Sequence, residues 1–221
     1  MTTSRSLAAP LLAEFVGTAL LLAAVVGSGI MAERLSGGNV GVALLANAIA
    51  TGGALYALII MLGPVSGAHF NPAVTVALAV AGLAERRCVL PYALVQIVGG
   101  IVGVWLAHLM FDLPILQAST KLRSGIGQWA GEITATFGLA LLILIGARRG
   151  SAALPAAVAC YIVGAYWFTS STSFANPAVT IARALSDTFA GIAPAHAPGF
   201  IIAQLVGTGV ALLVARRLRD A

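Results

Sequence analysis

Long apolar segments separated by short polar stretches set the pattern of this chain. Most of these segments reach the roughly 20 residues that an α-helix needs to cross a hydrocarbon core of ~30 Å. The sequence therefore predicts an all-α membrane protein with six transmembrane helices. In chain order the apolar segments are residues 7–31, 40–62, 89–111, 129–147, 152–168 and 199–215.

One short motif occurs twice and relates the two halves of the chain. The sequence Asn-Pro-Ala-Val-Thr stands at residues 71–75 and again at residues 176–180. A five-residue identity in comparable apolar surroundings indicates an internal repeat. We expect one domain over residues 1–221, with one repeat over about 7–111 and the other over about 128–216.

Each copy of the motif has the chemistry of a helix start. Pro72 and Pro177 suit the first position of a helix, where a missing N–H group costs nothing. Asn71 and Asn176 then stand at the N-cap, where the side-chain oxygen accepts from first-turn N–H groups. An asparagine used in this way keeps its side-chain NH₂ group free to donate elsewhere.

The apolar runs after the two motifs predict half-helices that do not cross the membrane. Residues 74–83 and 179–185 are too few to span a bilayer. Each half of the chain then contains three spans and one half-helix. Because three is an odd number, the second half is inserted upside down relative to the first. The two re-entrant half-helices therefore enter from opposite faces and meet near the midplane.

Composition agrees with a membrane location. Hydrophobic residues make up 60% of the chain and charged residues 9%, with a mean hydropathy of +1.00. Cys88 and Cys160 lie in or near apolar segments, where we expect packing residues rather than a disulfide framework. The net charge of +5 follows the ends of the predicted spans, so we expect lipid as the surrounding partner and no nucleic acid.

The basic residues predict the orientation of the chain. Cytoplasmic loops carry an excess of Lys and Arg, which places both termini in the cytoplasm of a cell whose inner (plasma) membrane holds the protein. One side of the six-span arrangement carries Arg5, Arg86, Arg87, Arg148, Arg149, Arg216, Arg217 and Arg219. The other side carries Arg34, Lys121, Arg123 and Arg183.

Both halves place polar residues at matching positions inside their spans. Glu14 and Glu132 lie in the first span of each half, and Gln96 and Gln204 lie in the third. A carboxylate in a spanning helix is costly and indicates a function. Because lipid cannot hydrogen-bond the backbone ahead of each half-helix, we expect the two acids, together with His69, to brace those loops. A proton relay, as in a pump, is the other reading of the acids.

No pattern in the sequence predicts catalysis. The chain has no nucleotide-binding loop, nucleophile triad or paired-acid site. His69 has no second His or Cys at ligand spacing, so we expect no metal and no cofactor.

The paired motifs, the loop at residues 67–73, the acids in spans one and four, and the six-plus-two layout resemble the aquaporin/aquaglyceroporin (major intrinsic protein) family. The resemblance covers nearly the whole chain and implies an aquaporin-like fold and a homotetramer with one pore per subunit. It implies that the asparagines donate to solutes at the pore centre, where the positive ends of the half-helix dipoles repel protons and cations. The pore-centre residues are Asn71, Pro72, Ala73, Asn176, Pro177 and Ala178.

The chain departs from the family at the selectivity filter. Water and glycerol channels normally carry Arg three positions after the second Asn, and this chain has Val179 there. Arg183 follows one turn further on, and we do not assume that it substitutes. Carrying the other filter positions over by ungapped spacing gives the set Thr51, Gly164, Ser173 and Val179.

This set predicts a wide filter without a fixed charge. Loss of the Arg removes up to five donors and a positive charge. A bacterial subgroup of the family, associated with arsenical resistance, is similar in replacing the Arg by an apolar residue. The resemblance therefore implies neutral metalloid hydroxides such as arsenous acid, and methylated arsenicals, as solutes of a passive channel for small uncharged molecules.

Three other readings stay open. The chain is an ordinary water or glycerol channel if its filter tolerates Val179. It is a proton-coupled secondary transporter if Glu14 or Glu132 forms a coupling-ion site, since inverted repeats with broken helices also build transporters. A structural membrane protein would leave the polar caps of the half-helices without a purpose.

Overall fold

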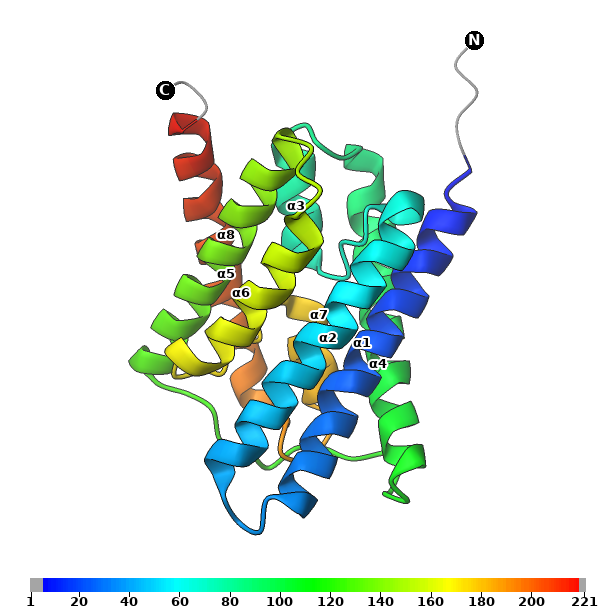
Figure 1. Ribbon diagram of the computed structural model, residues 1–221, viewed down its shortest axis with the longest axis vertical. Helices are drawn as coiled ribbons and strands as arrows, with labels where there is room; N and C mark the ends of the chain where they lie inside the picture. The colour runs from blue at the N-terminus through cyan, green and yellow to red at the C-terminus, as the bar shows by residue number, and fades with distance from the viewer. Residues whose placement is uncertain (1–5, 219–221) are drawn as a thin grey trace.

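The computed structural model describes residues 6–218, which form eight α-helices and two 3-10 helices (Figure 1). The predicted all-helical fold is confirmed. The α-helices are α1 (Ala8–Leu35), α2 (Val40–Ser66), α3 (Pro72–Val80), α4 (Val89–Met110), α5 (Ile126–Arg148), α6 (Leu154–Phe168), α7 (Pro177–Arg183) and α8 (Ala197–Arg217), with 3-10 helices at Arg86–Cys88 and Pro194–His196.

All six predicted spans are helices. Among the described residues, five helices are long and apolar enough to cross a membrane, namely α1, α2, α4, α5 and α8. Helix α6 is also apolar but has only 15 residues. Its start coincides with a proline in the first turn, which suits a helix N-terminus.

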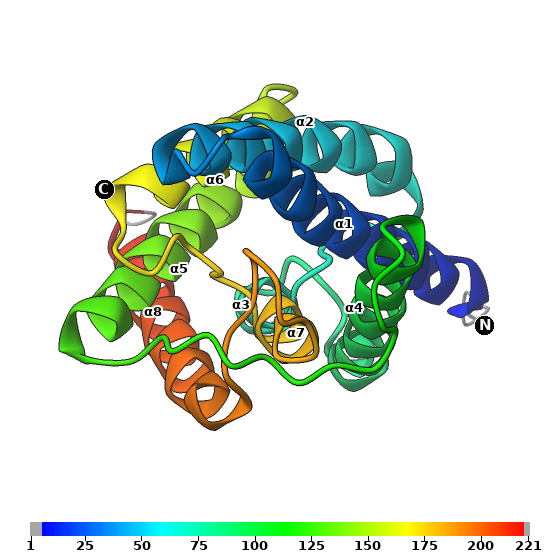
Figure 2. The same cartoon turned by 90° about the horizontal axis from the view of Figure 1, so that it is seen from below.

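The two short helices lie inside a ring formed by the long ones. Seen along the length of the molecule, α3 and α7 occupy the centre and the other six helices surround them (Figure 2). In the side view α3 lies in one half of the molecule and α7 in the other, with their N-terminal ends facing each other (Figure 1). This is the arrangement expected of re-entrant half-helices in an inverted repeat.

Equivalent helix pairs in the two halves pack backbone to backbone. Helix α4 crosses α1, and a Cβ atom added at Gly103 would collide with the carbonyl oxygen of Ala19. Helix α8 crosses α5 in the same way, and a Cβ atom at Gly207 would lie 2.5 Å from the carbonyl oxygen of Ile133. Small residues are what permits such close approach between helices in lipid.

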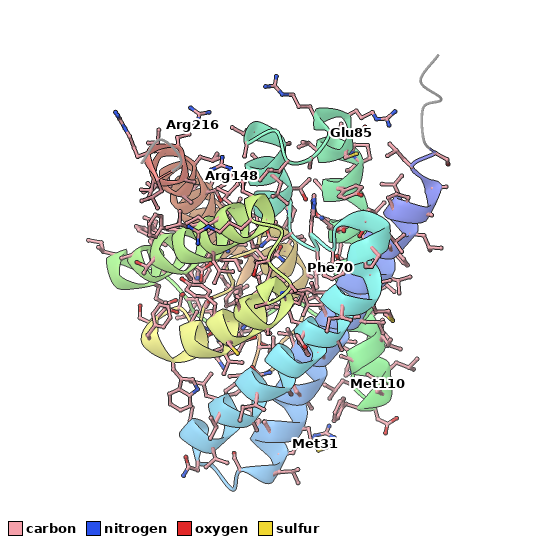
Figure 3. The ribbon with its side chains drawn as sticks, turned by 45° about the horizontal axis from the view of Figure 1, so that its top comes forward. Met31, Phe70, Glu85, Met110, Arg148 and Arg216 are labelled. Atoms are coloured by element: carbon pink, nitrogen blue, oxygen red, sulfur yellow. The ribbon has the colours of Figure 1, made fainter. Side chains whose placement is uncertain are left out.

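The cationic side chains divide between the two ends of the molecule. Arg148 and Arg216 lie at the end where the described chain begins and finishes, whereas Met31 and Met110 lie at the opposite end (Figure 3). Two arginines of the first predicted group, Arg5 and Arg219, fall outside the described residues. Which end faces the cytoplasm stays a prediction.

Candidate functional site

The asparagines of the two motifs cap the half-helices. The Asn71 Oδ1 atom accepts from the backbone N–H of Ala73 at 2.9 Å, and the Asn176 Oδ1 atom accepts from that of Ala178 at 2.9 Å. A proline occupies the first position of each helix. The motif therefore starts both helices at the same residue and aims both positive dipole ends at the middle of the molecule.

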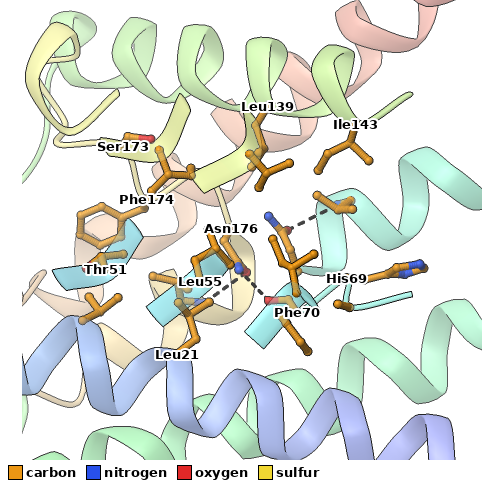
Figure 4. A pocket seen from close by; sticks show the side chains of 18 of the residues that line it. Leu21, Thr51, Leu55, His69, Phe70, Leu139, Ile143, Ser173, Phe174 and Asn176 are labelled. Atoms are coloured by element: carbon orange, nitrogen blue, oxygen red, sulfur yellow. Dashed lines mark hydrogen bonds between the residues drawn. The ribbon is translucent and has the colours of Figure 1, made fainter. Parts of the chain in front are cut away.

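The same asparagines join the two half-helices to each other. The Asn71 Nδ2 atom donates to the carbonyl oxygen of Ala175 at 2.8 Å. The Asn176 Nδ2 atom donates to that of Phe70 at 2.8 Å (Figure 4). Each amide carries two hydrogens, so one remains for a solute. The structure thus brings Asn71 and Asn176 together at the meeting point of the halves.

The loops before the half-helices share an unusual backbone. Ala68 and Phe70 have φ angles of 50° and 48°, and Ser173 and Ala175 have φ angles of 52° and 48°. A non-glycine residue in this left-handed region is uncommon, and such residues gather at functional sites. In both loops these residues with positive φ stand one and three positions before the Asn. The two half-helices are therefore preceded by the same strained backbone geometry.

Glu14 holds the first loop. Its Oε1 atom accepts from the Ser66 hydroxyl at 2.6 Å and the His69 backbone N–H at 2.9 Å. Its Oε2 atom accepts from the Phe70 backbone N–H at 2.7 Å and the Gln96 amide at 2.7 Å. The carboxylate is fully buried, and four donors satisfy it.

Glu132 makes the equivalent contacts in the second half. It accepts from the backbone N–H groups of Phe174 at 2.8 Å and Ala175 at 2.9 Å, and from the Gln204 amide at 2.6 Å. It is also fully buried. Neither Glu132 nor Glu14 is among the described residues that line the central cavity.

A cavity of about 110 Å³ runs beside the tips of the half-helices (Figure 4). One wall is apolar and comes from the surrounding helices. The other wall comes from the loops and caps and includes Phe70, Asn71, Ser173 and Asn176. The apolar wall includes Leu21, Val25, Leu55, Ile59, Leu139, Ile143, Val158 and Ile162.

His69 lies on the polar wall of this cavity. Its Nδ1 atom is 3.1 Å from the Thr75 hydroxyl, and its ring meets the Tyr92 ring edge-on with 5.3 Å between centroids. Its backbone N–H is one of the groups held by Glu14. His69 is therefore fixed from both its backbone and its ring.

Three of the four predicted filter residues line the cavity. They are Thr51, Ser173 and Val179. The Ser173 hydroxyl is buried and has no hydrogen-bond partner in the described part of the chain. A polar group in that state is available to whatever occupies the cavity.

The fourth predicted filter residue, Gly164, does not line the cavity. Helix α6 instead presents Ile162 and Tyr166, which lie four residues apart on one face, and the Tyr166 hydroxyl donates to Thr51 Oγ1 at 3.3 Å. Gly164 stands two residues from each, about 200° around the helix. Counting positions from the second Asn does not show how α6 is rotated, so the place of Gly164 in the filter stays a prediction, and Tyr166 is a further α6 residue on the cavity wall.

Arginine side chains also approach the cavity. Arg183 ends α7 and lines the cavity, and Arg123 reaches the same region from the connection between α4 and α5. Arg123 was considered only as a topology marker, because nothing in the local sequence of a long connection shows that it folds back onto a half-helix.

Known proteins resemble this chain over most of its length. The model of the major intrinsic protein family matches residues 1–171. The aquaglyceroporin AqpS of Rhizobium meliloti (strain 1021) is 53% identical over 206 residues, which cover 93% of this chain and 88% of that protein. The probable aquaporin TIP2-2 of Oryza sativa subsp. japonica is 32% identical over 213 residues, which cover 92% and 84%.

A solved structure has the same fold. The aquaglyceroporin from Plasmodium falciparum superposes with a TM-score of 0.73 at 21% identity, over 94% of this chain and 95% of that chain. At this identity the likeness supports the fold alone, whereas the sequence matches decide the family. The chain therefore belongs to the major intrinsic protein family, whose members are membrane channels and not enzymes.

Proposed function

We propose that this chain is a passive channel for small uncharged solutes, with water, glycerol and neutral metalloid hydroxides such as arsenous acid or methylated arsenicals among them. The observation that carries the proposal is Val179, an apolar side chain on the cavity wall at the filter position. The 53% identity to a protein named an aquaglyceroporin supports solutes larger than water.

Solutes would be guided by few polar groups. The spare amide hydrogens of Asn71 and Asn176 donate at the centre, and the unpaired Ser173 hydroxyl can donate or accept further along. The opposite wall is mostly apolar, with the hydroxyls of Thr51 and Tyr166 hydrogen-bonded to each other. A small neutral hydroxide or polyol exchanges part of its water shell for these groups, while an ion loses far more hydration than the cavity returns.

The role of the two glutamates argues against a proton-coupled transporter. A coupling site needs a titratable group on the solute path. The carboxylate oxygens of Glu14 and Glu132 accept hydrogen bonds from the loops, and neither residue lines the cavity among the described residues. We therefore assign them, with His69, to bracing the loops. The ordinary water or glycerol channel differs from our proposal only in its response to arsenous acid.

The test compares permeabilities in proteoliposomes. Light scattering reports water, glycerol and urea, and elemental analysis of the vesicles reports arsenous acid. We expect the wild type to pass all four. Val179→Arg should lower the glycerol and arsenous acid permeabilities several-fold, because a long charged side chain then fills the filter.

Val179→Thr is the matched control, since it keeps the shape of the side chain and should behave like the wild type. An unchanged set of permeabilities in Val179→Arg would contradict the filter assignment. If glycerol passes and arsenous acid does not, the ordinary water or glycerol channel is the better reading. Saturable uptake driven by a proton gradient would favour the transporter.

We further propose a homotetramer in the plasma membrane with both termini in the cytoplasm. The family resemblance supports the tetramer, and the greater number of arginines at the end that holds the termini supports the orientation.

A further inference from the structure

Two guanidinium groups lie close to one aromatic ring that lines the cavity. The Arg183 Cζ atom lies 3.4 Å from the centroid of the Phe174 ring, and the Arg123 Cζ atom lies 5.2 Å from it. Phe174 follows the filter residue Ser173 and lines the cavity. We call the region of Ser173, Phe174 and Arg183 the outer mouth.

Arg183 is buried, and most of its donors are unused. Its side chain is 2% exposed, and its Nε atom donates to the carbonyl oxygen of Ala190. Its terminal nitrogens have no hydrogen-bond partner among residues 6–218, although the side chain lines the cavity. Four N–H bonds of the guanidinium are therefore available to the contents of the pore.

Neither guanidinium forms a salt bridge among the described residues. The ion pair found there joins Arg87 to Glu85, at the other end of the molecule. Arg123 binds the carbonyl oxygens of Gly191 and Ser171. A buried cation without a paired anion is costly, and within a membrane protein such a residue marks the solute path.

Arg183 stands one turn beyond the filter position. It follows Val179 by four residues on α7, which puts the two side chains on one face about 6 Å apart along the helix axis. Neighbouring segments hold the end of α7, since Ser119 N–H donates to the Ala184 carbonyl at 2.9 Å and Ala193 N–H donates to that of Lys121 at 2.7 Å. The long connection between α4 and α5 crosses this end of the molecule (Figure 2).

We propose that Arg183, which lies over the Phe174 ring, is the charge filter of this pore. The positive charge stands one turn beyond the filter position, so cations are repelled there while Val179 leaves the filter position itself wide. Separating the two tasks lets larger neutral solutes pass without admitting cations. The inference rests on the proposed channel function.

Urea and guanidinium ion test the inference, because the two are nearly equal in size and shape and differ in charge. Guanidinium has no neutral form near pH 7, so its uptake into proteoliposomes reports cation passage alone. We expect the wild type to pass urea and exclude guanidinium. Arg183→Gln should raise the ratio of guanidinium to urea permeability by about tenfold, since the repulsion of a unit charge at the mouth is lost.

Two controls separate charge from structure. Arg183→Lys keeps the charge and loses the flat stacking group, and should exclude guanidinium like the wild type. Arg34→Gln removes an exposed arginine that also stacks on a phenylalanine, Phe111, outside the cavity, and should leave the ratio unchanged. Equal ratios in Arg183→Gln and the wild type, or a raised ratio in Arg183→Lys, would overturn the inference.

Moving the charge gives an independent test. The double variant Val179→Arg/Arg183→Gln should restore exclusion of guanidinium and at the same time lower the urea permeability, because charge and narrowing then coincide. If Arg183→Gln does not reach the membrane, Arg123→Gln removes the second positive charge beside Phe174 and should raise the ratio of guanidinium to urea permeability by a smaller factor. An unchanged ratio in Arg123→Gln would contradict the proposal. A wild type that passes no neutral solute would instead contradict the proposed channel function itself.

Discussion

At the scale of single residues, buried polar groups decide the shape of the pore. The sequence could predict that Glu14 and Glu132 brace loops, because they recur at matching places and the loops need partners inside lipid. It could not predict the partners, since the contact from Glu132 to Phe174 joins elements far apart in the chain. The sequence also could not show that Tyr166 faces the cavity, because the rotation of α6 is set by packing and not by counting.

Replacing one brace should destabilise the fold. Glu132→Ala leaves three buried donors without an acceptor, and each such donor costs about 1–3 kcal/mol. We expect a clearly lower melting temperature in detergent, measured by intrinsic fluorescence. Glu33→Ala removes an exposed glutamate and should melt like the wild type. Equal melting of the two variants would contradict the bracing role.

At the scale of elements, hydropathy located the helices but not all their ends. The first span was predicted to stop at residue 31, and α1 continues to Leu35 because the polar residues Glu33 and Arg34 extend the helix beyond its apolar part. Helix α2 likewise continues through Pro64 to Ser66. The first half-helix ends at Val80, before Gly82 with φ at 74°, and not at the predicted residue 83.

The helix crossings give a prediction at this scale. Gly207→Ala should lower the melting temperature, because the added methyl group would lie 2.5 Å from the Ile133 carbonyl and push α8 off α5. The better helix propensity of Ala, worth about 1 kcal/mol, works in the other direction. Gly209 lies on the same helix, and a Cβ atom there would meet nothing within 4 Å, so Gly209→Ala should raise the melting temperature or leave it unchanged. A Gly207→Ala variant as stable as Gly209→Ala would refute the close packing.

At the scale of the whole molecule, two inverted halves enclose one central cavity and present apolar side chains on the outside. Large hydrophobic side chains such as Leu12, Leu90 and Leu213 are exposed on the outside, while the carboxylates of Glu14 and Glu132 are buried. The repeated motif and the three apolar spans in each half were enough to predict the inverted halves and the facing half-helices. The outer mouth could not be predicted, because Phe174, Arg123 and Arg183 come together only when a long connection folds over α7.

The orientation can be checked with reporter fusions at the C-terminus. A fluorescent protein that matures only in the cytoplasm should be bright, and an alkaline phosphatase that works only outside should be inactive. The reason is the predicted excess of arginines on the side where the described chain begins and ends, the end at which Figure 3 shows Arg148 and Arg216. A fusion to the 36–39 connection between α1 and α2, at the opposite end, should give the reverse pattern. Phosphatase activity at the C-terminus would invert our assignment.

The crossed amide bonds at the centre limit what this protein can do mechanically. Asn71 and Asn176 each hold the backbone of the other half while capping their own helix. Any rocking of one half against the other would break both crossed bonds in a single movement. A carrier needs this rocking of one half against the other in every transport cycle, whereas a channel does not. Flux through this molecule should therefore rise with temperature only as steeply as solute mobility does.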